Sequence, residues 1–453
     1  MTKHKPKTVR ELALYLIEQV HQQQAYSPLV LNQAIEANRL EGRDSALLTQ
    51  LVYGVLQREL TLDFYLKSFL KPKQKLDDWV RYLLFLSLYQ MVFLDRIPSH
   101  AIVSEAVNIA KKRGHQGISG FVNGVLRNVL RKGVPSFEKL PLEERLSIEY
   151  SHPVWLVKRW LAQYGVETTE KTLAANNEPP SVTARVNPLK TSKQEVMAEL
   201  ERDGFEVTEG ELTPDAIVIK KGKLIGHRLF LEGFVSIQDE SSMLVARALD
   251  VASGMEVLDT CAGPGGKTTH LAELMEDQGK IIALDLHIHK TALIEDQANR
   301  LGIHSIETRA LDARKVQSVF SPQTFDRLLI DAPCTGFGVI RRKPEIKYTK
   351  SEKDIYSLSG IQAAILESCA DLLKPGGKLV YSTCTIDHEE NRNQIQAFLA
   401  NHPDYKLDHT LKERLSLPKE LDLIEREDGV IQILPSDFDT DGFFISCLVR
   451  EGK

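Results

Sequence analysis

The stretch MEVLDTCAGPGGKTTHLAELM, residues 255–275, constrains the fold of this chain more than any other. It has the order of an apolar strand, a glycine-rich turn and an amphipathic helix, with which Rossmann-like sheets bind a ligand at the carboxyl ends of their strands. From residue 236 onward, strand-like runs alternate with amphipathic segments of helix length, a pattern typical of a doubly wound parallel sheet. We therefore predict a Rossmann-like α/β domain over residues 236–453.

The glycine-rich turn limits the kind of ligand that this domain binds. Gly263, Gly265 and Gly266 allow a ligand to approach the backbone closely, and N–H groups at the start of the helix favour an anionic group there. A phosphate-binding loop of the form GxxxxGK[ST] would need glycine at position 261, which is cysteine. The turn is not GxGxxG either, so it gives no particular support to a nicotinamide cofactor.

Acidic residues end the strands that follow this turn. Asp285 closes the next strand, roughly twenty residues further on, where a carboxylate can accept hydrogen bonds from ribose hydroxyls. Asp312 follows a possible third strand, placed to meet an adenine edge, and Asp331 ends the fourth. Any one of them alone fits a cap or turn residue. Together with the turn they indicate a site for S-adenosylmethionine, and we expect a methyltransferase rather than another Rossmann-like enzyme.

Two further domains precede the α/β domain. From residue 8 to about 132, apolar residues recur at helical spacing without alternating strand-like stretches, which predicts an all-helical domain over residues 1–140. Prolines and charges in KGVPSFEKLPLEE indicate a linker after it. Residues 150–235 combine the helical SHPVWLVKRWLAQYG with strand-like SVTARVN, FEVTEG and AIVIKK. This mixture predicts a small α+β module.

Charge is distributed unevenly along the chain. Residues 1–150 carry 21 Lys and Arg against 15 Asp and Glu, although the whole chain has a net charge of −5. The basic clusters KPKQK (71–75), KKR (111–113) and RNVLRK (127–132) fit a polyanion-binding face and a solvated helical surface equally well. Apolar runs near the N-terminus are short and broken by charge. We therefore expect neither a signal peptide nor a transmembrane span, and hence a cytoplasmic protein.

The five cysteines are widely spaced and show neither a zinc-site nor a disulfide pattern. Cys369 in AILESCADLL and Cys447 in GFFISCLVR are expected in the core, whereas Cys261 in the glycine-rich turn fits either a structural or a functional role. Cys334 in DAPCTG and Cys384 in YSTCT differ from these. Each closes an apolar run at the sheet edge where the cofactor should bind, so we expect both to be functional.

Two cysteines at this edge indicate a particular methyl transfer. Amine-methylating enzymes of this fold typically have a polar-Pro-Pro-aromatic stretch after the fourth strand, where this chain has DAPC. Carbon 5 of a pyrimidine is a poor nucleophile, so a thiolate must first add to carbon 6, and a base must later remove the carbon-5 proton. Asp331 is placed to hydrogen-bond the polar edge of the pyrimidine. Spacing alone leaves open whether Cys334 or Cys384 forms the bond.

The sequences DTCAGPGGKTTH, DAPCTGFGVIRRKPEIKY and LVYSTCTIDHEEN together closely resemble the motifs of the RNA cytosine-5 methyltransferases, the family of the Nop2 and Sun/Fmu/RsmB proteins. WVRYLLFLSLYQMVFLDRIPSHAIVSEAVNIAKKRG and GFVNGVLRNVLR resemble NusB, a helical RNA-binding antitermination factor. A NusB-like domain fused to this catalytic domain is the arrangement of the RsmB branch, so the resemblance covers nearly the whole chain. It implies methylation of one cytidine in 16S ribosomal RNA, expected at position 967, before or during small-subunit assembly.

The resemblance also assigns roles to individual residues. The cofactor loop falls on Cys261, Ala262, Gly263, Pro264, Gly265, Gly266 and Lys267, with Asp285, Asp312 and Asp331 completing the site. The nucleophile falls on Cys384, and Cys334 matches the family's cysteine that helps the enzyme release the methylated base. Many relatives have alanine where this chain has Gly263, and we expect no consequence from that departure.

RNA contacts are expected in three places. Arg341, Arg342 and Lys343 directly follow the catalytic loop and are expected to contact phosphates near the target nucleotide, with a solvated basic loop as the alternative. The NusB-like domain and the middle module, with TARVNPLK (183–190), would hold flanking RNA and give salt-sensitive binding.

The catalytic motifs do not specify the RNA, so one alternative is a cytosine-5 methyltransferase that acts on transfer RNA or another RNA. A second alternative is a non-catalytic RNA-binding assembly factor. We expect no metal, no membrane and a monomeric protein.

Overall fold

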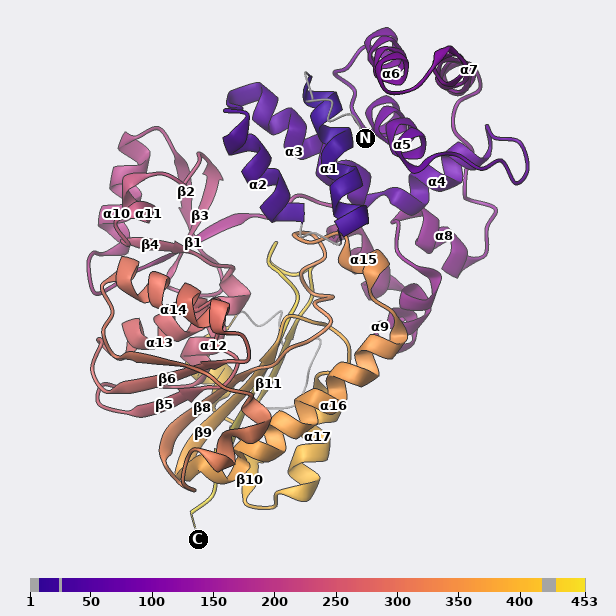
Figure 1. The fold of residues 1–453 in the computed structure, drawn as a ribbon. Helices are drawn as coiled ribbons and strands as arrows, with labels where there is room; N and C mark the ends of the chain where they lie inside the picture. The colour runs from indigo at the N-terminus through magenta and orange to yellow at the C-terminus, as the bar shows by residue number, and fades with distance from the viewer. Residues whose placement is uncertain (1–7, 24–26, 418–428, 453) are drawn as a thin grey trace. The chain divides into compact units, whose positions relative to one another are not determined.

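The computed structural model describes residues 8–23, 27–417 and 429–452 (Figure 1). It divides into two compact units. One comprises residues 1–178 and 340–350, and the other comprises residues 179–339 and 351–453. The chain therefore passes between the units three times.

The first unit is helical throughout its described residues. A large cluster of buried aliphatic and aromatic side chains, including Leu14, Leu51, Leu84 and Leu126, packs helices α1 to α7 together, which confirms the helical periodicity of the sequence. The helices are α1 (Val9–Gln23), α2 (Ser27–Ala37), α3 (Gly42–Gln57), α4 (Glu59–Lys67), α5 (Asp78–Phe93), α6 (Ser99–Arg113), α7 (Gln116–Lys132), α8 (Leu142–Glu149) and α9 (Val154–Ala175).

Residues 340–350, which carry the short helix α15 (Ile346–Thr349), belong to this helical unit. The Glu345 carboxylate accepts hydrogen bonds from the backbone N–H (3.2 Å) and hydroxyl (2.8 Å) of Ser27, at the start of α2. Lys347 Nζ is fully buried and donates to the carbonyl oxygen of Gln57 at 2.6 Å. The sequence pattern places this segment in the C-terminal domain, because these contacts join residues far apart in the sequence and leave no local signal.

A four-stranded antiparallel sheet forms the middle module, in the order β2-β3-β1-β4. Its hydrophobic core includes Val196 and Leu200 from the helix α10 and Ile217 from the sheet. The helix α10 begins at a capping box between Ser192 and Glu195. The elements are β1 (Val182–Val186), α10 (Lys193–Arg202), β2 (Glu206–Glu209), β3 (Ala216–Lys221), α11 (Arg228–Leu231) and β4 (Val235–Ile237).

The larger sheet carries the glycine-rich turn. In the described residues it has eight strands, in the order β10-β12-β9-β8-β5-β6-β7, with β11 paired to β12. The strands from β5 to β9 run parallel, and β12 is antiparallel to β9. The strands are β5 (Glu256–Asp259), β6 (Lys280–Asp285), β7 (Ile306–Ala310), β8 (Phe325–Asp331), β9 (Leu373–Thr383), β10 (Tyr405–Leu407), β11 (Val430–Ile433) and β12 (Phe443–Arg450). The strand order reverses between β5 and β8, which is where ligands bind in such sheets.

Helices cover both faces of this sheet, and successive strand residues pack on opposite sides. Val257 belongs to the core that includes the helices α12, α13 and α14, whereas Leu258 belongs to the core that includes α16 and α17. The helical elements are α12 (Glu240–Ala248), α13 (Gly266–Leu274), α14 (Ile288–Leu301), η1 (Ala313–Ser318), α16 (Glu352–Cys369), η2 (Ala370–Leu372), α17 (Arg392–Asn401) and α18 (Leu411–Leu415). The predicted fold class, helical, then α+β, then Rossmann-like α/β, is confirmed.

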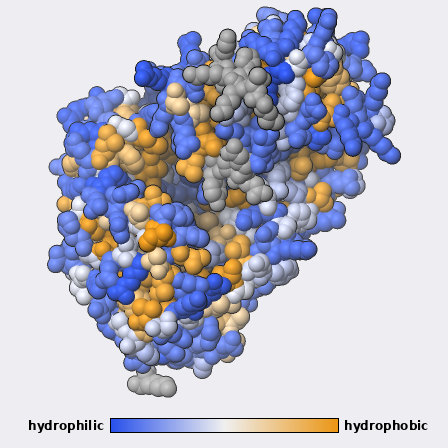
Figure 2. Space-filling model, in the orientation of Figure 1, coloured by the Kyte–Doolittle hydropathy of each residue, from blue (hydrophilic) through white to orange (hydrophobic). Residues whose placement is uncertain are grey.

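The helix α9, predicted within the middle module, lies in the same compact unit as the N-terminal helices. No helix in the described ranges combines the length and apolar character that a membrane crossing requires. On the face drawn in Figure 2, hydrophilic residues predominate and apolar residues gather in separate areas.

Candidate active site

The glycine-rich turn lies between β5 and α13, as the sequence predicts. Gly265 has a φ of 107° and directly precedes the helix, a conformation that favours glycine. The Gly265 N–H donates to the Ala262 carbonyl at 2.7 Å, and the Ala262 N–H donates to the Leu284 carbonyl, also at 2.7 Å. The first bond closes the turn, and the second joins the turn to β6. The peptide bond between Gly263 and Pro264 is cis.

Asp285 ends β6 beside the turn. Its carboxylate accepts the N–H of Gly263 at 3.2 Å and the N–H of His287 at 3.0 Å. A Cβ at position 263 would lie 2.5 Å from Asp285 Oδ2. Alanine there would therefore require this carboxylate to move. The expectation that Gly263 has no functional consequence stays a prediction.

The residues around Asp285 fit an adenosine moiety. Leu286 and Ile288 follow Asp285 and expose 59% and 71% of their surface, so apolar side chains are available to an adenine ring beside a carboxylate that suits ribose hydroxyls. Asp312 lies beyond the end of β7, where it caps η1 and forms an ion pair with Arg314 at 2.7 Å. The hydrogen bond from Arg314 lowers the pKa of Asp312. The contact between Asp312 and adenine stays a prediction.

Asp331 ends β8 and contacts the glycine-rich turn. Lys267 Nζ donates to Asp331 Oδ2 at 2.7 Å, and the hydroxyl of Ser382 donates to Asp331 Oδ1 at 2.8 Å. Burial acts to lower the pKa of Lys267, but the negative charge of Asp331 and its hydrogen bond to the ammonium outweigh burial and raise that pKa. The turn, the end of β8 and the end of β9 therefore meet around one ammonium group.

Cys334 and Cys384 meet at this edge of the sheet. Their Sγ atoms lie 3.4 Å apart, and the backbone carbonyl of Cys384 accepts the N–H of Gly338 at 2.9 Å. The hydrogen bond to Cys384, followed by burial, raises the pKa of Cys334 well above its usual value. The two thiols therefore lie in contact where β8 and β9 end, and their separate catalytic roles stay predictions.

The other cysteines lie in apolar surroundings. Cys369 and Cys447 are fully buried and belong to the two cores of the sheet, as predicted. Cys261 packs against the core beside α16, and burial raises its pKa strongly. This environment favours a structural role for Cys261.

Glu390 supports the Cys334 loop, although the sequence pattern does not single it out. Its carboxylate accepts the backbone N–H of Thr335 at 2.9 Å, the hydroxyl of Thr335 and the side-chain amide of Gln362 at 3.1 Å. Burial raises the pKa of Glu390 to about 7. In the sequence, Glu390 falls within the motif LVYSTCTIDHEEN, seven residues after Thr383, the last residue of β9.

We expect the buried Glu390 to make stability depend on pH. Because its folded pKa of about 7 lies above the ordinary value of 4.5, folding favours the protonated form. That contribution is complete below the unfolded pKa and is lost as the pH rises towards the folded pKa. Glutamine does not titrate, so the melting temperature of Glu390→Gln, measured relative to that of the parent, should increase as the pH is raised from about 5 to about 8. A difference that stays constant across this range would contradict the buried proton.

The three basic residues expected to contact phosphates differ in exposure. Arg341 is only 2% exposed, whereas Arg342 and Lys343 are partly exposed. Burial of Arg341 argues against its direct contact with RNA, so the phosphate contact stays a prediction for Arg342 and Lys343.

Some of the basic side chains of the helical unit already have acidic partners. Lys112 pairs with Glu11 at 2.6 Å, and Arg113 pairs with Glu18 at 2.7 Å. The KKR cluster is therefore partly neutralised by α1. Residues 71, 73 and 75 of the KPKQK cluster are exposed, so this cluster remains a candidate RNA-facing surface.

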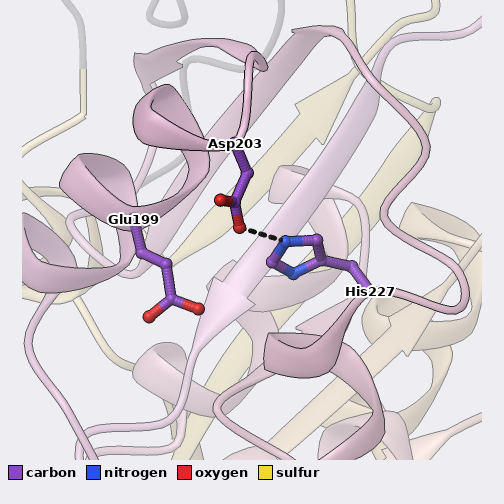
Figure 3. Close-up of side chains that lie close together, drawn as sticks. All are labelled: Glu199, Asp203 and His227. Carbon is purple, nitrogen blue, oxygen red and sulfur yellow. Dashed lines mark hydrogen bonds and ion pairs between the residues drawn. The ribbon is translucent and has the colours of Figure 1, made fainter.

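A cluster in the middle module, shown in Figure 3, has the composition of a metal site. Potential ligand atoms of Glu199, Asp203 and His227 lie within 4.8 Å of one another. However, Arg228 donates to Glu199 at 2.6 Å, and His227 Nε2 pairs with Asp203 at 2.9 Å. These ion pairs account for the cluster, and we assign no metal to it.

Comparison with known families covers all three parts of the chain. Residues 246–449 match the family described as 16S rRNA methyltransferase RsmB/F. Residues 7–131 match the NusB family. Residues 152–225 match the ferredoxin-like domain of RsmF/B-like methyltransferases.

Individual relatives extend over nearly the full chain. The probable ribosomal RNA small subunit methyltransferase B of Bacillus subtilis is 50% identical over 450 residues, covering 99% of this chain and 100% of the relative. Ribosomal RNA small subunit methyltransferase B of Shewanella oneidensis is 36% identical over 414 residues, covering 90% and 91%. The crystal structure of PH0851 matches with a TM-score of 0.83 and 30% identity over 99% of both chains. A methyltransferase homolog from Pyrococcus horikoshii matches with a TM-score of 0.59 and 30% identity, covering 69% of this chain and 99% of that one.

Proposed function

This chain belongs to the RsmB/F family of S-adenosylmethionine-dependent methyltransferases, and from that membership we propose that it methylates carbon 5 of one cytidine in 16S ribosomal RNA, cytidine 967. The observation that carries the proposal is the pair Cys334 and Cys384, whose sulfur atoms lie 3.4 Å apart beside the cofactor turn. An amine-methylating enzyme has no need of two thiols at this position. A carbon-5 methyltransferase needs one thiol to bond to carbon 6 and groups that assist its departure.

The proposed roles follow from the contacts of each side chain. Cys384 adds as a thiolate to carbon 6, and the ammonium group of Lys267 stabilises negative charge beside it. Asp331, held by Lys267 and Ser382, is oriented to hydrogen-bond the polar edge of the base. Once carbon 5 carries the methyl group, a base removes the carbon-5 proton and the bond between carbon 6 and the Cys384 sulfur breaks. The Cys334 thiol then donates a hydrogen bond to the departing Cys384 thiolate.

S-adenosylmethionine supplies the electrophilic methyl group when bound. The backbone of residues 261–267 and the carboxylate of Asp285 are the groups that would hold it. The target base must leave its stack to reach this edge, which costs least in a loop or in partly assembled RNA.

Methyl transfer to defined RNAs tests the proposal. With radiolabelled cofactor, the purified chain should label 16S ribosomal RNA, and nucleoside analysis should recover the label as 5-methylcytidine. Preferential labelling of transfer RNA would establish the alternative substrate. Absence of labelling on every RNA, with cofactor binding intact, would favour a non-catalytic assembly factor.

A cytoplasmic location, a monomeric state and independence from metal remain predictions. Size-exclusion chromatography with light scattering tests the second of them directly.

A further inference from the structure

Arg185, in the TARVNPLK stretch expected to hold RNA, does not face solvent. Its side chain is fully buried in the described structure. The guanidinium donates from Nε to Glu273 at 2.7 Å and from Nη2 to Glu273 at 2.9 Å and Thr269 at 3.1 Å. From Nη1 it donates to the Gly266 carbonyl at 2.7 Å and to the side chain of Gln238. All five of its N–H donors are therefore engaged, and none is left for a phosphate.

The partners of Arg185 belong to the cofactor-binding element. Gly266 is the last glycine of the turn and the first residue of α13, and Thr269 and Glu273 lie one and two turns further along that helix. The Thr269 hydroxyl also lies 2.9 Å from the Gly265 carbonyl. Arg185, which extends from β1 of the middle module, thus binds the Gly266 carbonyl directly and reaches the Gly265 carbonyl through the Thr269 hydroxyl. Both carbonyls lie where the backbone must approach the cofactor.

The ion pair between Arg185 and Glu273 is charged and buried, so it depends on accurate geometry. Arg185 and Glu273 expose 0% and 1% of their side chains, and a buried ion pair recovers its desolvation cost only with good geometry and further hydrogen bonds. An apolar pair could join the two elements without that cost. The planar guanidinium additionally fixes the direction of each bond.

A second contact holds the same helix from the same module. Asp215, directly before β3, accepts from Arg247 Nη2 at 2.6 Å and lies 3.1 Å from His270 Nε2. Successive residues of α13, Thr269 and His270, are therefore tied to the middle module. The packing makes the module part of the support of the cofactor site.

We propose that Arg185 is a positioning residue that sets the conformation of the cofactor turn, so that the middle module supports S-adenosylmethionine binding in addition to any contact with RNA. Arg185 acts through Gly266 and Thr269 and does not touch the base. The proposal rests on cofactor dependence alone and is independent of which RNA or which carbon atom is methylated.

Calorimetric titration with S-adenosylhomocysteine, in the absence of RNA, tests this proposal on the full chain. Arg185→Lys keeps the charge but loses the fork geometry, and its dissociation constant should rise by about tenfold or more. The KM for the cofactor should rise in parallel, while kcat at saturating cofactor and RNA affinity stay within about twofold. Arg300→Lys is the matched control. Arg300 joins α14 to the middle module through the carbonyls of Phe230 and Val235 without touching the turn, so cofactor affinity should not change.

Thr269→Val provides a second, milder variant that keeps the pair of Arg185 with Glu273. It should weaken S-adenosylhomocysteine binding by about threefold. If Arg185→Lys does not fold, the cofactor affinity of Thr269→Val tests the proposal in its place. A folded Arg185→Lys chain with unchanged cofactor affinity would overturn the proposal. Weaker RNA binding with unchanged cofactor affinity would overturn it too and restore the RNA contact.

Discussion

Replacing Cys384 with alanine should abolish methyl transfer, lowering the rate by about 10⁴-fold or more. Cys384 directly follows β9 and lies beside the cofactor turn, where the Lys267 ammonium stabilises a negative charge. Without a thiolate at carbon 6, carbon 5 of cytosine is not nucleophilic enough to accept a methyl group. Cofactor binding should persist, because the residues of the turn and Asp285 are unchanged. Single-turnover transfer of radiolabelled methyl groups measures the loss.

Cys369→Ala is the matched control for this experiment. Cys369 is fully buried at the end of α16 and packs within the core of the sheet, so its replacement tests the effect of removing a sulfur from the same unit without touching the site. It should lower stability slightly and leave the rate nearly unchanged. Residual methylation by Cys384→Ala at a rate near that of the parent would show that the roles of the two thiols are wrongly assigned.

Replacing Cys334 with alanine should have a different effect, namely the accumulation of a covalent complex between protein and RNA. The thiol of Cys334 lies 3.4 Å from the Cys384 sulfur and retains its proton, because the contact with Cys384 raises its pKa. Loss of this hydrogen-bond donor leaves the departing thiolate unassisted. Turnover should fall by roughly 10²–10⁴-fold, the range for removal of a proton-handling group.

Denaturing gel electrophoresis measures this outcome. The Cys334→Ala chain mixed with 16S RNA and cofactor should give a slowly migrating band that survives denaturation, and the double variant lacking Cys384 should not. A Cys334→Ala chain that turns over normally, without such a band, would exclude Cys334 from product release.

The local pattern of the sequence predicts the cofactor edge well. Short apolar runs, separated along the chain by amphipathic segments of helix length, specify β5, β6 and β8. Because parallel strands present their carboxyl ends on one edge, Asp285 and Asp331 necessarily lie near the turn. The proximity of Cys334 and Cys384 follows from the pairing of β8 with β9. Their separate roles do not follow from topology and come from the family resemblance.

Other features depend on long-range contacts that no local pattern shows. Arg185 is separated from Glu273 by 88 residues and Glu390 from Thr335 by 55, so their burial becomes visible only in the fold. The same is true of Glu345, whose contact with Ser27 spans 318 residues and brings a catalytic-domain segment into the helical unit. The basic run at residues 341–343 is expected from the sequence to face solvent, but Arg341 is buried in the fold. Its burial, too, has no local signal in the sequence.

Bisulfite sequencing of 16S ribosomal RNA from cells that lack this chain tests the central proposal most directly. In parent cells, one cytidine, expected at position 967, should resist conversion. In cells without the chain, that cytidine should convert fully, and resistance should return with the parent gene but not with Cys384→Ala. An unchanged pattern of resistant cytidines in 16S RNA would contradict the assignment of this substrate.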